Sequence, residues 1–222
     1  MGYRHYGVNT GGLPVNYIRN LLTVLDVPIF IETGTAGGES VRAASSIFAK
    51  CHTIEVVEGR PQGEFPINVE LHEGDSAKLL SSIVEKYKTE WIFFWLDAHW
   101  SEPYASEEDQ SECPLIDEIK AINHAQSIIM IDDARLFFGP PVWPCDPRKW
   151  PVLKDVFLHL HYKFPDHITT IIDDYIVCLP QQLKDTFYHE WRGRFFERFP
   201  TEEEKIRLAT RKAYENLMKY IE

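Results

Sequence analysis

The chain has 222 residues, of which 44% are hydrophobic and 26% are charged, and its formal net charge is −11 at pH 7. This composition is typical of one large folded domain with an appendage and excludes a largely disordered chain. The acidic balance argues against a nucleic-acid partner, and no apolar run approaches the roughly 20 residues of a membrane span. The four cysteines are far apart, and nothing at the start resembles a signal peptide. We therefore expect free thiols in a cytoplasmic protein.

The first part of the chain alternates between helical and extended patterns. Apolar residues recur at helical spacing over residues 15–25, and the apolar stretch 29–31 predicts a strand. A glycine-rich loop separates this strand from a second predicted helix over residues 40–49. A short apolar strand over residues 53–57 completes a strand–helix–strand unit.

The middle of the chain repeats this alternation. Residues 69–72 alternate like a strand, and a helical pattern over residues 77–87 follows them. Residues 91–96 are continuously apolar, which is typical of a central parallel strand covered on both faces. A helix over residues 114–121 and an apolar strand over residues 128–131 complete this part.

The pattern after residue 150 predicts an antiparallel end to the sheet. A helix over residues 150–161 precedes two strands, over residues 168–172 and 175–179. Asp173 and Asp174 lie between these strands and favour a tight turn. A hairpin at this point would make the last strand antiparallel.

These elements predict an α/β fold, namely a Rossmann-like, doubly wound and mostly parallel seven-stranded sheet with an antiparallel last strand. A C-terminal helical extension follows, in which Thr201 and Glu204 form a capping box. We expect a lead-in and helix over residues 1–27, a ligand-binding domain over residues 28–180 and the extension over residues 181–222. The extension would pack on the sheet or pair two subunits as a homodimer.

The segment FIETGTAGGES, from residue 30 to residue 40, reads as a strand that turns through glycines into a helix. Glycine allows positive φ and a close ligand approach, and the start of a helix offers unpaired N–H groups. Glu32 stands two residues before Gly34, at the mouth of this loop. Its carboxylate would repel a pyrophosphate but could hold a cationic amine or a ribose hydroxyl, which argues against an NAD-dependent oxidoreductase.

Acidic residues end four of the predicted strands. They are Glu32, Glu55, Asp97 and the pair Asp132 and Asp133. Ligands of a doubly wound sheet bind at the carboxyl ends of its strands. So many carboxylates at one edge would repel an anion, so we expect the site to bind cationic groups.

Strand-end acids, the glycine loop and a Gly-Asp-Ser turn at residues 74–76 together resemble the class I S-adenosylmethionine-dependent methyltransferases over residues 28–180. More narrowly, the sequence LDAHW at residues 96–100, followed by IDD at residues 131–133, is similar to that of small-molecule O-methyltransferases that bind a divalent metal. The macrocin-type sugar O-methyltransferases belong to this group. S-adenosylmethionine carries a sulfonium and an ammonium, which suit a site rich in carboxylates.

The resemblance implies S-adenosylmethionine as cofactor and a set of residues that bind it. Glu32 and the glycine loop would hold its methionine part, and Asp75 with Ser76 would flank its adenine. Glu55 would bind the ribose hydroxyls, and Glu58 is a nearby alternative for this role. The full implied set is Glu32, Gly34, Thr35, Ala36, Gly37, Gly38, Ser40, Glu55, Asp75, Ser76 and Asp97.

Three carboxylates predict a metal site beside the cofactor. Asp97, Asp132 and Asp133 are all-oxygen ligands of the kind that Mg²⁺ prefers, with Ca²⁺ or Mn²⁺ as alternatives. Without a cation they would repel one another. The alternative is that Asp132 and Asp133 cap the next turn while Asp97 only touches the cofactor. Arg135, just after the pair, would either neutralise these acids or steer an acidic substrate.

His99 is the candidate catalytic base, with Asp97 as its catalytic neighbour. The two residues are two positions apart, so in an extended chain their side chains share one face. An imidazole with a pKa near 6.5 suits removal of a proton from a metal-activated hydroxyl. A metal ligand and a packed structural histidine are the alternatives. Six further histidines show no comparable pattern and are interpreted as surface or core residues, namely His72, His124, His159, His161, His167 and His189.

The sequence thus predicts an enzyme that moves a methyl group from S-adenosylmethionine to a hydroxyl of a small molecule, a sugar or another polar metabolite, with a divalent metal. A metal-independent methyltransferase and a non-catalytic cofactor-binding protein of the same fold are the alternatives. No short motif identifies the acceptor, because acceptor pockets are built from variable loops. The acidic loop 102–112 is long enough for a lid, and a solvated loop is the alternative.

Overall fold

The computed structural model describes residues 12–99, 112–139 and 146–188, together with residues 202, 206, 207, 209 and 210. The chain divides into two compact units, of which the first ends at Lys184 and the second begins at Asp185. The domain boundaries drawn from the sequence stay predictions. The predicted capping box at Thr201 and Glu204 and the acidic loop up to residue 111 lie outside the described residues.

Helices and strands alternate through the first unit, as the sequence predicts. The elements in chain order are α1 (Val15–Leu21), β1 (Ile29–Thr33), α2 (Glu39–Ala44), β2 (Lys50–Glu55), β3 (Val69–Glu73), α3 (Ser76–Val84), β4 (Ile92–Leu96), α4 (Leu115–Ala121), β5 (Ser127–Ile131), the 3-10 helices η1 (Ala134–Phe137) and η2 (Pro147–Lys149), α5 (Leu153–Lys163), β6 (His167–Ile172), β7 (Tyr175–Pro180) and the 3-10 helix η3 (Gln181–Leu183).

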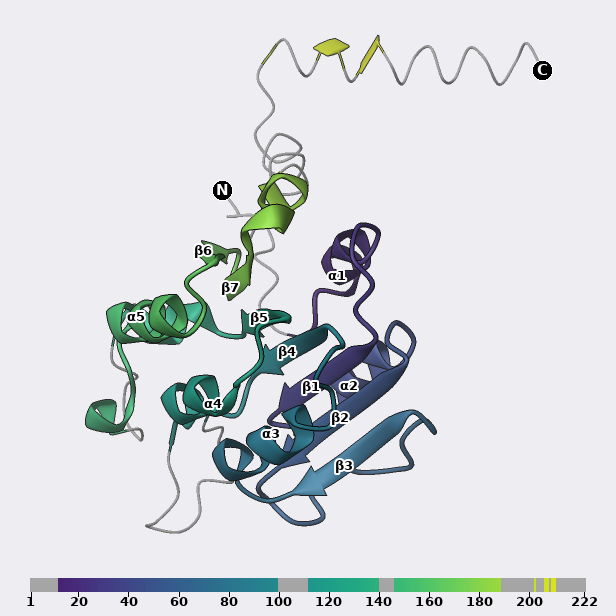
Figure 1. The fold of residues 1–222 in the computed structure, drawn as a ribbon, viewed down its shortest axis with the longest axis vertical. Helices are drawn as coiled ribbons and strands as arrows, with labels where there is room; N and C mark the ends of the chain where they lie inside the picture. The colour runs from purple at the N-terminus through teal and green to yellow at the C-terminus, as the bar shows by residue number, and fades with distance from the viewer. Residues whose placement is uncertain are drawn as a thin grey trace, which may run out of the picture. The chain divides into compact units, whose positions relative to one another are not determined.

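The strands form one seven-stranded sheet in the order β3-β2-β1-β4-β5-β7-β6 (Figure 1). Neighbouring strands from β3 to β5 run parallel, and β7 runs antiparallel to both β5 and β6. The predicted fold class, a mostly parallel doubly wound sheet with an antiparallel last strand, is therefore confirmed. From β1 the chain builds the sheet outward to β2 and β3, and it then crosses to β4 on the other side of β1. This reversal of the strand order leaves a crevice at the carboxyl ends of β1 and β4.

Helices cover the central strands on both faces. Every residue of β1, β4 and β5 is buried, which explains the continuous apolar runs of these segments. Figure 1 shows α3, α4 and α5 lying one after another along one face, and their apolar residues share a single core with the sheet. On the other face the ring of Phe48, just after α2, packs against Phe30 and Phe93.

Two helices end earlier than their apolar patterns predict. Thr23 donates a hydrogen bond to the carbonyl of Asn20, and Ser45 and Ser46 donate to the carbonyls of Arg42 and Ala43. Hydroxyl side chains that bond to backbone carbonyls compete with the regular helical pattern. Accordingly α1 ends at residue 21 rather than 25, and α2 ends at residue 44 rather than 49.

The second half of the sheet follows the predicted hairpin, with a shifted helix before it. Pro151 disfavours helical backbone at Trp150, so α5 begins at Leu153 instead of residue 150. Asp173 has a φ of 51° and supplies the left-handed turn between β6 and β7. The neighbouring Asp174 is buried and has a different role, described below.

Three cysteines lie among the described residues, and each has a buried free thiol, as predicted. They are Cys51, Cys113 and Cys178. Burial raises the pKa of Cys51 and of Cys113 to about 12 and that of Cys178 to about 11. Within the described part of the chain, no helix has the length and apolar character needed to cross a membrane.

Candidate active site

The register of the parallel strands brings the acidic strand ends to one edge of the sheet. Thr33 at the end of β1 pairs with Leu96 at the end of β4, and Leu96 pairs with Ile131 at the end of β5. The next residues continue this ladder. The amide of Asp97 donates to the carbonyl of Thr33, and that of Asp132 to the carbonyl of Leu96, each at 3.1 Å. Residues that are far apart in the sequence thus meet at the crevice.

The glycine loop packs directly against the end of β4. Gly34 has a φ of 82°, and its amide donates to the carbonyl of Ile54 at 2.9 Å. A Cβ atom at Gly34 would lie 2.3 Å from the carbonyl oxygen of Asp97, so a side chain does not fit there. Gly38, with a φ of 85°, precedes α2, and Ser40 lies in the first turn of that helix.

Arg42 of α2 holds the outer side of this loop. Its guanidinium donates to the carbonyl of Gly37 at 2.7 Å and to the carbonyl of Gln62 at 2.5 Å. The same group stacks on the ring of Phe65, 4.5 Å from the ring centroid. The loop and the segment that follows β2 are therefore joined by one side chain.

Glu32 lies beneath the glycine loop, not at its mouth as the sequence suggested. Its side chain is 1% exposed, and Oε2 accepts a hydrogen bond from the Thr53 hydroxyl at 2.5 Å. The Thr53 hydroxyl is in turn 2.7 Å from that of Thr35. Burial raises the pKa of Glu32 well above its usual range against the lowering effect of Thr53, and the charges of Asp97 and Glu55 raise it further. Glu32 therefore anchors the loop through the two threonines.

Glu55 ends β2 and binds the backbone on both of its sides. Its Oε2 accepts from the amide of Ala36 at 2.8 Å, and its Oε1 accepts from that of Val57 at 3.0 Å. The guanidinium of Arg60 lies 3.6 Å from Oε1. The alternative acid, Glu58, is exposed. A carboxylate has about four lone-pair positions, so Glu55 retains acceptor capacity beyond these contacts.

Asp75 and Ser76 form the turn between β3 and α3. The Asp75 side chain caps α3 by accepting from the amide of Ala77 at 3.0 Å, and Lys78 Nζ lies 3.0 Å from its other oxygen. Ser76 donates its hydroxyl to the buried carboxyl of Glu118 in α4. The turn is therefore fixed from both sides.

Glu118 is a site residue that the sequence analysis missed. It is 1% exposed, and burial raises its pKa to about 7, while hydrogen bonds with Ser76 and Thr33 lower it. Leu115, Glu118 and Ile119 share the buried face of α4. The available signal was an acidic residue at an apolar position of a helical pattern.

Asp97, His99 and Asp133 form the closest cluster of ionisable groups at the crevice. Nε2 of His99 lies 3.0 Å from Oδ2 of Asp133 and 3.2 Å from Oδ1 of Asp97. One ligand atom from each of the three residues falls within 4.8 Å of the others. Both ring nitrogens of His99 are buried and have no aligned hydrogen-bond partner among the described residues. Nε2 of the ring therefore faces the two carboxylates.

Each member of this cluster has a shifted pKa. Burial, with the charges of Asp132 and Asp133, raises the pKa of Asp97 to about 7, against the lowering effect of His99. Burial alone would lower the pKa of His99, but the contact with Asp133 and the charge of Asp97 raise it above its usual range. Burial alone would raise the pKa of Asp133, but the contacts with His99 and Arg135 lower it below its usual value. The shifts have the pattern of one shared positive charge between two carboxylates.

Asp132 is not one of the three residues of this cluster, and the metal set Asp97, Asp132 and Asp133 stays a prediction. Oδ1 of Asp132 accepts from the amide of Asp133 at 2.8 Å, and burial raises the pKa of Asp132 to about 6. Asp133 has a φ of 54°, which turns its side chain toward His99. Arg135 lies 2.7 Å from Asp133 and pairs with Asp174 of the β6–β7 turn. Arg135 therefore neutralises acids, one of the two roles predicted for it.

The donors of the cluster fit a divalent cation. Ligand atoms that are neighbours around an octahedral ion with bonds of about 2.1 Å lie roughly 3 Å apart. The observed separations of 3.0 and 3.2 Å join Nε2 of His99 to the two carboxylates, and they match that spacing when His99 is itself a ligand. With His99 as the base, the ligands are the carboxylates of Asp97 and Asp133. The carboxylates of Asp97 and Asp133 suit Mg²⁺ or Mn²⁺, whereas the imidazole is a donor that favours other metals.

A cleft of about 400 Å³ borders this cluster at His99. That volume lies within the range of small-molecule sites, roughly 300–1,000 Å³. Its walls come from the glycine loop, the ends of β2 and β3, and the segment after β4, and they include Gly34, Ile54, Arg60, Asp75, Ser76 and His99. Gly34, Asp75 and Ser76 of the set implied for the cofactor therefore face a common space with the candidate base His99.

No family model matches the sequence, and no match is found among curated proteins. Among solved structures, the chain is similar to a MycE methyltransferase from the mycinamycin biosynthetic pathway, in complex with Mg, SAH and mycinamycin VI. The identity is 15%, the TM-score is 0.43, and the match covers 74% of this chain and 45% of that one. The chain thus spans less than half the length of that protein.

Two further solved structures have comparable similarity. One is described as cmcI-D160 with Mg and SAM, at 15% identity and a TM-score of 0.45, covering 75% of this chain and 72% of that one. The other is a putative O-methyltransferase from Klebsiella pneumoniae, at 15% identity and a TM-score of 0.44, covering 81% of this chain and 83% of that one. At these values the likeness concerns the fold, and the argument for function rests on the residues of the site.

Proposed function

We propose that the chain is an S-adenosylmethionine-dependent methyltransferase that methylates a hydroxyl of a small polar molecule with the help of a divalent cation. The observation that carries this proposal is the single cleft onto which Gly34, Asp75, Ser76 and His99 all open. Its lining joins the glycine loop and the Asp75–Ser76 turn to the imidazole of His99, which in turn contacts the carboxylates of Asp97 and Asp133. A methyl donor and a hydroxyl acceptor need these two sets of groups side by side.

The cofactor supplies an electrophilic methyl group on a sulfonium when it is bound. The backbone of the loop after Gly34 is the surface for its methionine part. Glu55 has lone pairs left for ribose hydroxyls, and Asp75 with Ser76 stands where adenine would lie. Arg60 borders the same cleft and lies 3.6 Å from Glu55.

Asp97 and Asp133 would hold the cation, which would increase the acidity of an acceptor hydroxyl. His99 takes up the hydroxyl proton at Nε2, the nitrogen that faces both carboxylates. General bases act within hydrogen-bond reach of the proton they remove. Glu118 and Ser76 keep the adjoining turn in place below the cleft.

A metal-independent methyltransferase is the second candidate, and one observation favours it. Protonated His99 by itself places a positive charge within 3.2 Å of both carboxylates. In that case the imidazolium neutralises Asp97 and Asp133, and catalysis rests on positioning of the acceptor alone.

Isothermal titration with S-adenosylmethionine tests the cofactor, with NADH as the competing ligand class. Binding of the first and not the second is expected, and absence of S-adenosylmethionine binding would refute the proposal. Turnover is then measured on a panel of sugars and phenols as the mass gain of one methyl group, with Mg²⁺ and with chelator. Equal rates in both conditions favour the metal-independent candidate. Bound cofactor without turnover on any acceptor favours a non-catalytic binding protein.

A further inference from the structure

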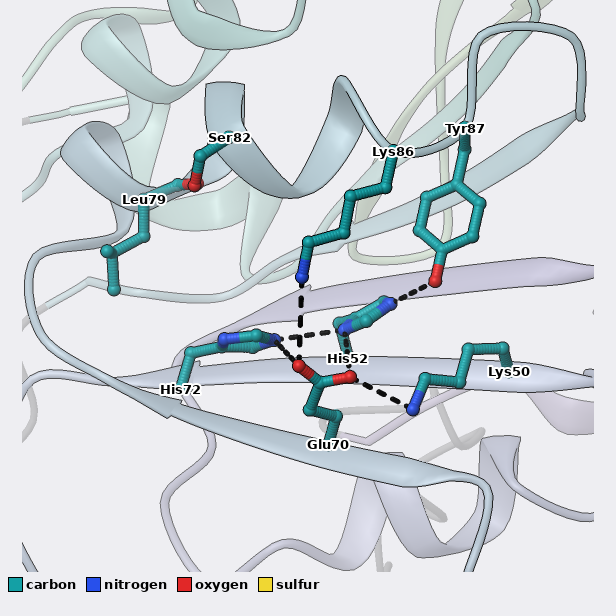
Figure 2. A network of polar contacts seen from close by, with 8 residues as sticks. All are labelled: Lys50, His52, Glu70, His72, Leu79, Ser82, Lys86 and Tyr87. Atoms are coloured by element: carbon teal, nitrogen blue, oxygen red, sulfur yellow. Dashed lines mark hydrogen bonds and ion pairs between the residues drawn. The ribbon is translucent and has the colours of Figure 1, made fainter.

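A second polar cluster lies on β3, at one edge of the sheet, and on its neighbour β2. His52 belongs to β2, and Glu70 and His72 belong to β3. The parallel register pairs His52 with Glu70, and residues two positions apart on a strand share a face. All three side chains therefore lie on the face that carries α3, as Figure 2 shows. The sequence pattern assigns no partner to His72.

The spacing of the ligand atoms is that of a metal site. Nδ1 of His52 lies 2.9 Å from Nε2 of His72, and each nitrogen is 3.7 Å from an oxygen of Glu70. Zn–N bonds are about 2.0–2.1 Å long, so neighbouring ligand atoms in a tetrahedral site are roughly 3.3 Å apart. The observed distances lie on both sides of that value. Rotamer adjustments of a few tenths of an ångström would bring all three donors to one ion.

Tyr87, just beyond α3, sets the orientation of the buried histidine. Its hydroxyl is 2.6 Å from Nε2 of His52, which leaves Nδ1 facing the cluster (Figure 2). Such an outer hydrogen bond is a regular feature of histidine ligands. The His52 side chain is fully buried, and burial disfavours its charged form. A neutral imidazole is the form that binds a metal.

Two lysines occupy the surroundings of the carboxylate. Nζ of Lys50 lies 3.0 Å from Glu70, and Nζ of Lys86 lies 3.7 Å from it, with both side chains partly exposed. A cation at the cluster would take over their role of balancing the Glu70 charge. Their long flexible stems allow the ammonium groups to move into water. The metal therefore competes with an existing network, which limits its affinity without closing the site.

We propose that His52, Glu70 and His72 bind a Zn²⁺-type divalent cation at a site separate from the crevice. Imidazole donors suit zinc and related transition metals, whereas Mg²⁺ and Ca²⁺ prefer oxygen donors. Three protein ligands leave a fourth position for water. The ion would tie the edge strand β3 to β2. This site depends on none of the residues assigned to methyl transfer.

Zinc titration of the full chain after chelator treatment tests the site. The Asp133→Asn variant is used with excess Mg²⁺, so that the crevice does not contribute. Binding of a single zinc ion and a higher melting temperature are expected. Co²⁺ in place of zinc should give the visible absorption of a four-coordinate site.

His72→Gln in that background should lose the zinc and the Co²⁺ absorption. His161→Gln is the matched control, because His161 is an exposed histidine outside the cluster, and it should behave like the parent. If His72→Gln does not fold, Glu70→Gln carries the comparison, since the Glu70 side chain is 42% exposed and tolerates change. Absence of zinc binding in the parent would overturn the proposal, as would undiminished binding in both ligand variants.

Discussion

Nε2 of His99 lies 3.0 Å from Oδ2 of Asp133. His99 follows β4 and Asp133 follows β5, so that α4 and β5 separate the two residues in the chain. The contact joins the end of β4 to the end of β5. Asp132 makes a different contact, because its carboxylate accepts a hydrogen bond from the backbone amide of Asp133. The two adjacent aspartates therefore have distinguishable roles.

The first prediction concerns these aspartates. Asp133→Asn should weaken Mg²⁺ or Mn²⁺ binding at the crevice by at least about tenfold, because it removes a charged ligand, a loss of roughly 1.4 kcal/mol or more. Asp132→Asn should have a smaller effect on the metal, since Asp132 lies outside the cluster. Titration calorimetry with the metal ion measures both. If metal affinity falls more in Asp132→Asn than in Asp133→Asn, Asp132 is a metal ligand, as the sequence predicts.

The second prediction separates a base from a ligand at His99. If His99 takes the acceptor proton, His99→Gln should lower turnover by about 10²–10⁴-fold while metal affinity changes little. If His99 is a ligand, metal affinity and turnover should fall together. Parallel measurement of metal binding and of kcat on one acceptor decides between the two outcomes. His161→Gln, an exposed histidine of α5, is the control and should leave both quantities unchanged.

Much of the fold follows directly from the residues. The strands β1, β4 and β5 are buried on both faces, so their sequences are continuous apolar runs that need no partner to be recognised. The helix ends were less predictable. Hydroxyl side chains such as Ser45 and Thr23 decide them through single hydrogen bonds, and an apolar pattern does not register these bonds.

The candidate site was predictable at strand ends and not beyond them. Glu55 and Asp97 stand where parallel strands end, and this position alone indicates a ligand site. Which aspartate of the pair reaches His99 depends on a left-handed backbone at Asp133 and on Arg135. Arg135 is held by a residue of the distant β6–β7 turn. Sequence neighbours give no information about that long-range contact.

The third prediction is a pH dependence of stability that comes from Glu118. Its pKa is raised to about 7 in the folded chain, against a usual 4.5. The folded state therefore keeps a proton that the unfolded state loses, so stability falls as pH rises from about 4.5 to 7, by up to roughly 3 kcal/mol. Glu118→Gln keeps an acceptor for Ser76 and removes this loss.

Urea unfolding at pH 5 and pH 8 measures the effect. The drop in unfolding free energy between these pH values should be smaller in Glu118→Gln than in the parent, although other buried acids such as Asp97 keep part of it. Asp117→Asn is the control, because Asp117 is exposed on the same helix and should leave the drop unchanged. An identical pH dependence in the parent and in Glu118→Gln would mean that Glu118 is ionised in the folded chain.

The fourth prediction concerns the contact between the glycine loop and the end of β4. Gly34 and Gly59 both have positive φ, 82° and 68°, so alanine at either position costs about 1–2 kcal/mol of backbone strain. At Gly34 the new Cβ would also lie 2.3 Å from the backbone oxygen of Asp97, whereas at Gly59 nothing lies within 4 Å. Overpacking of this kind adds about 1–3 kcal/mol.

Gly34→Ala should therefore be the more destabilising change in urea unfolding, and it should also weaken S-adenosylmethionine binding, because the loop has to move away from Asp97. Gly59→Ala isolates the cost of positive φ and should leave cofactor binding intact. Equal destabilisation by the two variants would show that the loop yields without disturbing the strand end.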